Sequence, residues 1–172
     1  MNDNYCIEEG VPSELKPIVE DSYDNANSPP RNICIRNVEK LIKSGEHLVA
    51  YDIIQEGLKL WQDEPRLLQL QALIYSRAGS FRKAEQILTQ IESKNGSSEE
   101  TTGLLGSIYK NLWRLEKNSR KKKQYLNLSY HYYHLAYTQN DSSYWAGLNS
   151  AVMATVRGDI RQAEKLASSI FT

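Results

Sequence analysis

Three stretches of this chain share one pattern: SGEHLVAYDIIQEGL (residues 44–58), AGSFRKAEQILTQI (residues 78–91) and RGDIRQAEKLASSI (residues 157–170). In each stretch a glycine is followed five residues later by an alanine, and apolar residues recur at helical spacing. The pairs are Gly45 and Ala50, Gly79 and Ala84, and Gly158 and Ala163. The first two glycines lie 34 residues apart. A repeat of this length indicates similar helical units stacked in a row.

A period of 34 residues is that of the tetratricopeptide repeat, in which each unit is a hairpin of two helices. Units that begin at Arg31, Pro65, Glu99 and near Tyr144 keep this register. The eighth position needs a small residue so that two helices approach closely, and the eleventh needs a large one that fills the space between hairpins. The eighth positions are Val38, Ala72, Gly106 and Ala151, and the eleventh are Leu41, Tyr75, Tyr109 and Ala154, of which the last departs from the pattern. The sequence predicts an all-α fold, a right-handed superhelix of about four tetratricopeptide hairpins.

Residues 1–30 differ from the repeats, since they are polar, show no sustained period and hold four of the chain's five prolines. We expect an irregular N-terminal arm there and a helical repeat domain over residues 31–172. Residues 1–32 carry seven acidic side chains and two basic ones, a net charge of −5. The arm is therefore acidic.

The third unit is longer than the period allows by about eleven residues. They form a basic insertion near residues 114–124, which includes EKNSRKKKQ (residues 116–124). Residues 110–123 hold seven basic side chains and one acidic one, a net charge of +6. The insertion either lengthens both helices of the third hairpin or forms a basic loop. The acidic arm and the basic segment either attract each other or are two independently solvated segments.

Residues 99–160 also carry a more specific pattern: GLLGSIYK (residues 103–110), the pair Ala136 and Tyr137, and YWAGLNSA (residues 144–151). In this order the elements resemble the TRAFs-binding domain of apoptosis-signal-regulating kinases and of bacterial signalling proteins. Two positions depart from that domain, because Asn111 stands in place of aspartate and Leu148 in place of isoleucine. The resemblance implies an interaction and regulatory module beside effector domains, with a role in sensing a nucleotide-derived signal.

The stretch YLNLSYHYYHLAY (residues 125–137) holds five of the 11 tyrosines and two of the three histidines. In the repeat register Tyr130, Tyr133 and Tyr137 fall on the packed face, whereas His131 and His134 fall on the opposite face and are expected to be solvated. A metal site would need further ligands nearby, and the two cysteines and the third histidine are distant in sequence. We predict no metal site here.

Nothing else in the chain has the pattern of a catalytic or cofactor site, since a glycine-rich phosphate loop, an HExxH motif and a CxxC motif are all absent. We predict a non-enzymatic protein that needs no cofactor. No run of ~18 apolar residues indicates a membrane span, and the N-terminus lacks the features of a secretion signal, so we expect a cytoplasmic protein. The basic run is short in a neutral chain, so nucleic acid is not the expected partner.

The first helices of tetratricopeptide hairpins line a concave groove, which is where we expect a partner or ligand. The predicted groove residues are Arg36, Arg66, Gln69, Arg77, Gly103, Ser107, Lys110, Asn111, Trp145 and Asn149. The cations suit an acidic peptide or a phosphate, and Trp145 suits stacking. Gly103 within a helix either leaves room, for a ligand or for the insertion, or is covered by a large neighbour such as Leu73 or Trp145.

Two functions are consistent with this groove. The first is a protein–protein interaction or regulatory module that binds a partner protein or peptide. The second is a sensor subunit of a stress or defence signalling system that binds a small anionic, nucleotide-derived ligand. The last helix ends in apolar residues, so self-association or a larger assembly through it is a further expectation.

Overall fold

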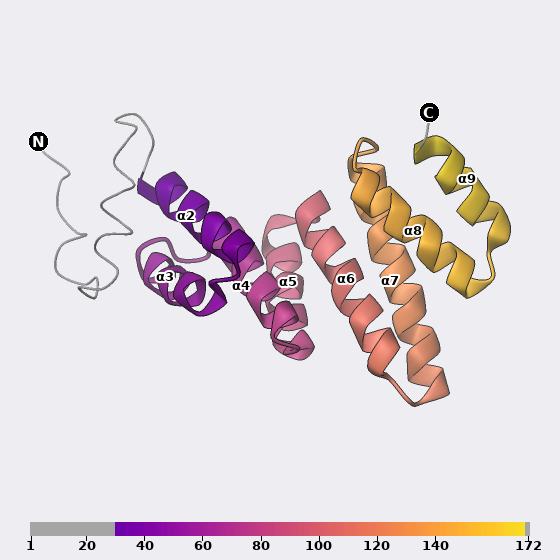
Figure 1. Cartoon of the computed structure of the whole chain (residues 1–172), viewed down its shortest axis with the longest axis horizontal. Coiled ribbons are helices and arrows are strands. Elements are labelled where there is room, and N and C mark those ends of the chain that lie inside the picture. Colours follow the sequence, from indigo (N-terminus) through magenta and orange to yellow (C-terminus); the bar gives the residue numbers. More distant parts are fainter. Residues whose placement is uncertain (1–29, 171–172) are drawn as a thin grey trace, which may run out of the picture. The chain divides into compact units, whose positions relative to one another are not determined.

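The computed structural model describes residues 30–170, which form eight helices and no strand (Figure 1). The helices are α2 (Pro30–Ser44), α3 (His47–Leu60), α4 (Pro65–Arg77), α5 (Phe81–Asn95), α6 (Glu99–Leu115), α7 (Ser119–Gln139), α8 (Tyr144–Arg157) and α9 (Ile160–Ile170). The first helices of the four hairpins begin within one residue of the predicted starts. The all-α tetratricopeptide fold is therefore confirmed, whereas the predicted irregular arm lies outside the described residues.

Glycine in the left-handed conformation closes the turn inside the hairpins. Gly158 follows α8 with φ 84° and ψ 9°, and its N–H donates to the carbonyl oxygens of Ala154 and Thr155. Gly79, with φ 77°, donates from its N–H to the Ser76 carbonyl at 3.1 Å. A side chain in this conformation costs roughly 1–2 kcal/mol, which explains why the repeated pattern starts with glycine.

The chain divides into two compact units, Met1–Ile74 and Tyr75–Thr172, with the division inside α4. In the first unit α2 packs on α3, and the part of α4 up to Ile74 completes an apolar core. Val38, Ile54 and Leu67 in this core are fully buried. The eighth residue of the first repeat is thus a core residue, as the register predicts.

In the second unit α6 packs along α7, and α8 packs against both α7 and α9 (Figure 1). Small residues bring the helices together: the Ser129 hydroxyl, in place of the repeat's alanine, donates to the Gly106 carbonyl at 2.9 Å. Ala136, Ala146 and Ala154 are fully buried in the adjoining core. The helix axes approach closely because these positions carry no bulk.

The basic insertion lengthens both helices of its hairpin. α6 has 17 residues and α7 has 21, against 14 for α8 and 11 for α9. Only residues 116–118 connect α6 to α7, and the Asn118 side chain accepts from the Lys121 N–H at 3.0 Å, which caps α7. In Figure 1 the turn between α6 and α7 projects past the turn between α8 and α9.

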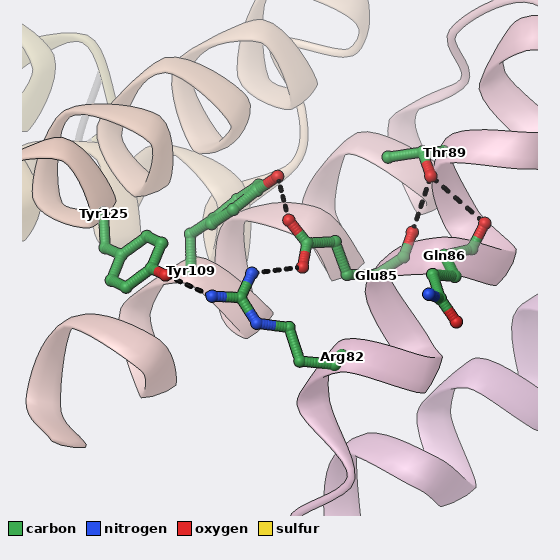
Figure 2. Close-up of polar contacts among 6 residues, drawn as sticks. All are labelled: Arg82, Glu85, Gln86, Thr89, Tyr109 and Tyr125. Atoms are coloured by element: carbon green, nitrogen blue, oxygen red, sulfur yellow. Dashed lines mark hydrogen bonds and ion pairs between the residues drawn. The ribbon is translucent and has the colours of Figure 1, made fainter. Parts of the chain in front are cut away.

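A polar network joins α5 to α6 and α7 (Figure 2). Glu85 accepts from the Tyr109 hydroxyl at 2.7 Å and from Arg82 at 2.7 Å, and Arg82 also donates to the Tyr125 hydroxyl. Burial and the neighbouring Glu85 carboxylate raise the pKa of Tyr109, so this hydroxyl remains a donor. The network satisfies the polar ends of rings that otherwise fill the space between hairpins.

The position of His134 differs from the sequence-based expectation. Its ring is half-buried and stacks on Tyr130, with ring centroids 5.5 Å apart, and Arg157 lies 4.2 Å from the same Tyr130 centroid. The His134 Nδ1 atom is buried and has no hydrogen-bond partner among the described residues. The prediction of a solvated His134 is therefore wrong, because the ring packs on Tyr130 of the same helix and Arg157 of α8 lies over that tyrosine, whereas His131 is exposed as predicted.

We expect acid to destabilise the second unit through His134. Burial, with the nearby positive charges of His131 and Lys165, lowers the pKa of His134. The unfolded chain therefore binds a proton more readily, so the free energy of unfolding falls as the pH drops below about 6.5. Urea denaturation at pH 7 and pH 5 should show a smaller acid-induced loss for His134→Phe than for the unchanged chain. His131→Phe is the matched control, and an equal effect of the two substitutions would contradict the assignment.

Candidate functional site on the α6–α8 face

The predicted groove residues fall into two groups. Arg36, Arg66 and Gln69 belong to the first unit, and the other seven belong to the second. In the second unit the structure brings two parts of the prediction together, since Lys110 on α6 contacts Asn149 on α8 and Gly103 on α6 lies next to the Trp145 ring. We call the surface formed by Gly103, Ser107, Lys110 and Asn111 of α6 with Trp145, Leu148, Asn149 and Val152 of α8 the α6–α8 face.

Two of the first-unit residues, Arg66 and Gln69, take part in local contacts. Arg66 forms an ion pair with Glu39 at 2.7 Å and donates to the Gln69 side chain at 3.3 Å. Gln69 is itself buried, whereas Arg36 is exposed on α2. Arg77, in the second unit, is exposed at the end of α4. The structure thus joins Arg66 to Gln69 and to Glu39.

Lys110 and Asn149 form the polar centre of the α6–α8 face. The Lys110 ammonium donates to the Asn149 Oδ1 at 2.8 Å and lies 5.3 Å from the centroid of the Tyr133 ring beneath it. Asn149 in turn donates through Nδ2 to the Trp145 carbonyl at 2.8 Å. Both amide atoms of Asn149 are therefore oriented, and they hold the ammonium group between two helices.

The charge of Lys110 is not balanced locally. No carboxylate in residues 30–170 forms an ion pair with it, and its charged neighbour is Arg114, one turn further along α6. Burial and the Arg114 charge together lower the pKa of Lys110. A half-buried cation next to a second cation is stabilised by an anion from outside. Chemically, this part of the face is suited to a carboxylate or a phosphate.

The two glycines of GLLGSIYK are explained by two aromatic rings. A Cβ on Gly106 would lie 2.8 Å from the Tyr133 ring, and a Cβ on Gly103 would lie 2.8 Å from the Trp145 ring. Tyr133 and Trp145 also meet edge to face, with centroids 5.4 Å apart. Of the two alternatives for Gly103, the structure shows the second, because Trp145 fills the space above it.

Alanine at these two glycines should give opposite results. Each substitution gains about 1 kcal/mol of helix propensity. At Gly106 the ring of Tyr133 is fully buried and cannot move, so an overpacking cost of about 1–3 kcal/mol exceeds the gain. At Gly103 the half-exposed Trp145 can shift, so stability should change little while the Trp145 indole NMR signal moves. Urea denaturation of Gly103→Ala and Gly106→Ala tests this, and equal destabilisation would contradict it.

An apolar stripe continues the face along α8. Trp145, Leu148, Val152 and Val156 follow one another at helical spacing and are 50%, 39%, 46% and 43% exposed. Val156 lies eleven residues after Trp145, so at the rise of an α-helix the stripe is about 16 Å long. Exposed apolar side chains gathered on one helix face indicate a contact surface, whereas scattered ones do not.

Sequence reasoning missed three contributors to this surface. Tyr133 supports the Lys110 ammonium from a helix assigned only to packing, Arg114 adds a second positive charge, and Val156 extends the apolar stripe. Helical spacing from Val152 and from Lys110 could have identified Val156 and Arg114. The contact with Tyr133 depends on the packing of α7 and has no signal in the sequence.

The described residues do not build a metal site or a reactive thiol. Among residues 30–170 no group of three or more His, Cys, Asp or Glu side chains is arranged to hold a metal ion. Within the same residues no helix is both long and apolar enough to cross a membrane. Cys34 is a half-buried free thiol, and burial raises its pKa to about 11, so it is a poor nucleophile.

The chain is similar to known tetratricopeptide proteins in sequence pattern and in structure. Residues 37–154 match the model of a family described as Tetratricopeptide Repeats-Sensor. No curated protein matches the chain.

Solved structures with the same fold come from several sources. TTC0263, a thermophilic tetratricopeptide protein of Thermus thermophilus, has a TM-score of 0.72 and 17% identity, with 81% of this chain and 72% of that chain covered. The human IFIT1 dimer with PPP-AAAA has a TM-score of 0.74 and 22% identity, with 94% of this chain and 36% of that chain covered. MamA (41-end) from Desulfovibrio magneticus RS-1 has a TM-score of 0.64 and 13% identity, with 91% of this chain and 81% of that chain covered. At these identities the likeness shows the fold alone.

Proposed function

This chain belongs to the Tetratricopeptide Repeats-Sensor family, and from that premise we propose that it is a non-enzymatic regulatory module that binds a partner protein or peptide through its α6–α8 face. The residues of the face come largely from GLLGSIYK and YWAGLNSA, the elements that resemble the TRAFs-binding domain. That resemblance supports a role beside effector domains of signalling proteins. We place the module in the cytoplasm as part of the same proposal.

One observation carries the proposal. The positive charge of Lys110 lies beside an exposed apolar stripe, and no carboxylate among the described residues forms an ion pair with it. Lys110, with Arg114 nearby, attracts a carboxylate, and the stripe from Trp145 to Val156 offers an elongated apolar contact. A stripe of about 16 Å suits an extended or helical peptide segment better than a compact small molecule. The expected partner segment therefore combines acidic and apolar side chains.

Capture of partners from the native cell lysate tests this function. The full chain, carrying an affinity tag, is compared with Lys110→Glu, which reverses the charge at the centre of the face. The affinity for a captured partner should fall about 10- to 100-fold, the effect of losing a charge-assisted hydrogen bond. Arg161→Glu, the same change on the exposed surface of α9, is the matched control. If Lys110→Glu and Trp145→Ala both leave capture unchanged, the α6–α8 face is not the binding site.

A small anionic ligand is the second candidate, and the geometry around Lys110 favours it. The ammonium, the Asn149 amide and the half-exposed Trp145 ring lie together, which is a suitable arrangement for a phosphate joined to a planar base. Structures of IFIT1, which share this fold, hold PPP-AAAA and m7Gppp-AAAA. Calorimetry with ATP, ADP and NAD⁺ tests this role. Binding abolished by Lys110→Glu would support a sensor, and capture of a protein without any nucleotide would support the interaction module.

Self-association through α9 remains part of the proposed function. Ile170 at the end of α9 packs against the core near Gly147, where a Cβ would lie 2.9 Å from it. The exposed side chains of α9 include the polar Arg161, Glu164 and Lys165 and the apolar Ile160, which is 51% exposed. Sedimentation of the full chain across a concentration series measures assembly through this helix.

A further inference from the structure

A group of exposed basic side chains surrounds the turn between α6 and α7. We call it the basic tip; its members are Arg114, Lys117, Arg120, Lys121 and Lys123, and all five are exposed. Within the second unit the long helices α6 and α7 carry this charge to the end of their hairpin, beyond the turn between α8 and α9 (Figure 1). The basic tip is therefore a projecting surface of this unit.

The charge of the basic tip is not balanced by its surroundings. Residues 114–123 hold six basic side chains and one acidic one, Glu116, a net charge of +5. The Glu116 carboxylate accepts from the N–H groups of Asn118 and Lys117, both at 2.9 Å, and these hydrogen bonds lower its pKa and hold it in the turn. Among the described residues no carboxylate forms an ion pair with any member of the basic tip.

The cations on α7 do not stabilise their own helix. Arg120, Lys121 and Lys122 lie in the first turn of α7, and that turn contains no acidic residue. Positive side chains near the N-terminus of a helix oppose its macrodipole, so they lower the stability of the helix. Neighbouring cations also repel one another. An anionic contact from outside the chain would relieve both effects, which packing within the chain does not.

The basic tip also has an apolar component. Leu115, the last residue of α6, is 66% exposed at the same turn. A carboxylate or a bare phosphate gives this side chain nothing to pack against. The boundary between the headgroups and the acyl chains of a membrane, in contrast, buries apolar side chains and attracts cations at the same time. The combination of Leu115 with the cations therefore indicates a membrane surface.

We propose that the basic tip docks this chain peripherally on a membrane surface that carries anionic phospholipids. The lipid phosphates pair with the exposed ammonium and guanidinium groups, and Leu115 enters the boundary between headgroups and acyl chains. Each lysine or arginine close to such a surface contributes about fivefold to the affinity. The contact is reversible and salt-dependent, and it needs no helix that spans the membrane.

The local charge of the basic tip matters more for this contact than the charge of the whole chain. The chain has a formal charge of +0. At physiological ionic strength the Debye length is about 8 Å, so exposed acidic groups further away are screened from lipids that touch the tip. A projecting tip also allows a flat surface to approach several cations together.

A nucleic acid or an acidic peptide fits the basic tip less well. Single nucleic-acid-binding modules bury roughly 600–1,000 Å² of protein surface, whereas these cations are confined to one hairpin end. Base stacking needs an accessible aromatic ring, and the Trp113 ring next to the tip is half-buried with the Lys122 ammonium 5.8 Å from its centroid. A peptide in a helical repeat usually lies along several helices, and the tip offers only the ends of two.

Co-sedimentation of the full chain with lipid vesicles tests the proposal. Vesicles of phosphatidylcholine with about 30% phosphatidylglycerol should bind the chain at low salt, and vesicles of phosphatidylcholine alone should not. About 1 M NaCl should release the chain, because the Debye length falls to about 3 Å. The variant R120Q/K121Q/K123Q should lower the affinity for anionic vesicles about 100-fold, and Leu115→Ser should lower it about 10-fold.

Matched variants show whether the basic tip itself is responsible. K40Q/K43Q/R161Q neutralises three exposed cations outside the tip. Leu60→Ser changes a leucine that is 53% exposed and is likewise the last residue of its helix, α3. Both variants should keep the affinity of the unchanged chain for anionic vesicles.

The tip variants should also remain folded, so a loss of binding has one meaning. R120Q/K121Q/K123Q removes charges that oppose the dipole of α7, so its urea denaturation midpoint should not fall. The proposal is overturned if anionic vesicles do not bind the chain, or if the tip variants bind them as well as the matched variants do. It is also overturned if oligouridine RNA at an equal phosphate concentration displaces the chain from the vesicles, because the tip would then prefer a nucleic acid.

Discussion

Tyr133→Ala is expected to lower the stability of the second unit by about 3–5 kcal/mol, the usual cost of removing a fully buried aromatic side chain. The Tyr133 ring is 0% exposed and lies between α6 and α8, against the backbone of Gly106 and the edge of Trp145. Because Gly106 has no side chain, the Tyr133 ring packs directly on its backbone. Removal of the ring therefore leaves a cavity that no Cβ of Gly106 can fill. Hydrogen exchange of the α6 and α7 amides should measure the loss in this unit separately from the first unit.

Two controls distinguish the contribution of the Tyr133 ring to stability from that of its hydroxyl and from that of another aromatic ring in the same helix. The buried Tyr133 hydroxyl has no hydrogen-bond partner among the described residues, and Tyr133→Phe keeps the ring, so this substitution should change the stability by less than about 1 kcal/mol. Tyr132→Ala removes a half-buried ring from the same helix, where it stacks on Tyr109 at 5.5 Å, and should cost less than Tyr133→Ala. If Tyr132→Ala and Tyr133→Ala were equally costly, the packing argument for Gly106 would be wrong.

The helices and their starts could be predicted from the sequence because the relevant signals are local. A positive φ at Gly79 and Gly158 and a proline at the first residue of α4 act through the backbone of their own turn. The eighth residues Val38 and Gly106 are buried because every hairpin repeats the same close approach. Period and local chemistry together therefore determine where each helix lies in its hairpin.

Side-chain partners in the candidate site could be predicted only in part. The register correctly placed Lys110 and Asn149 on neighbouring helices, and the structure joins them by a hydrogen bond. It could not decide between an open and a filled space above Gly103, because that depends on the rotamer of Trp145. It also failed for His134, since a helix face is solvated or covered according to how later helices pack.

Trp145→Ala should produce the opposite result from Tyr133→Ala, although the two rings touch. Trp145 is 50% exposed, so its removal should cost the second unit only about 1 kcal/mol, mainly the edge-to-face contact with Tyr133. In the proposed function its exposed side is the aromatic anchor of the α6–α8 face. Truncating such an anchor costs at least about 2 kcal/mol of binding free energy, or roughly 30-fold in affinity. Calorimetric titration of the captured partner measures this loss.

The comparison with Tyr144 decides whether the effect belongs to the face. Tyr144→Ala removes an equally exposed aromatic side chain, 52% against 50%, from the preceding position of α8, which lies outside the stripe. Affinity should therefore be retained in Tyr144→Ala and lost in Trp145→Ala, while hydrogen exchange shows both variants folded. Equal affinities would mean that α8 is not the contact surface. If Trp145→Ala lost both its affinity for the partner and its protection from hydrogen exchange, the ring would only support the fold. A selective loss of affinity requires the indole to contact the partner directly, because half of its surface faces solvent and its removal leaves Tyr133 and Gly106 in place.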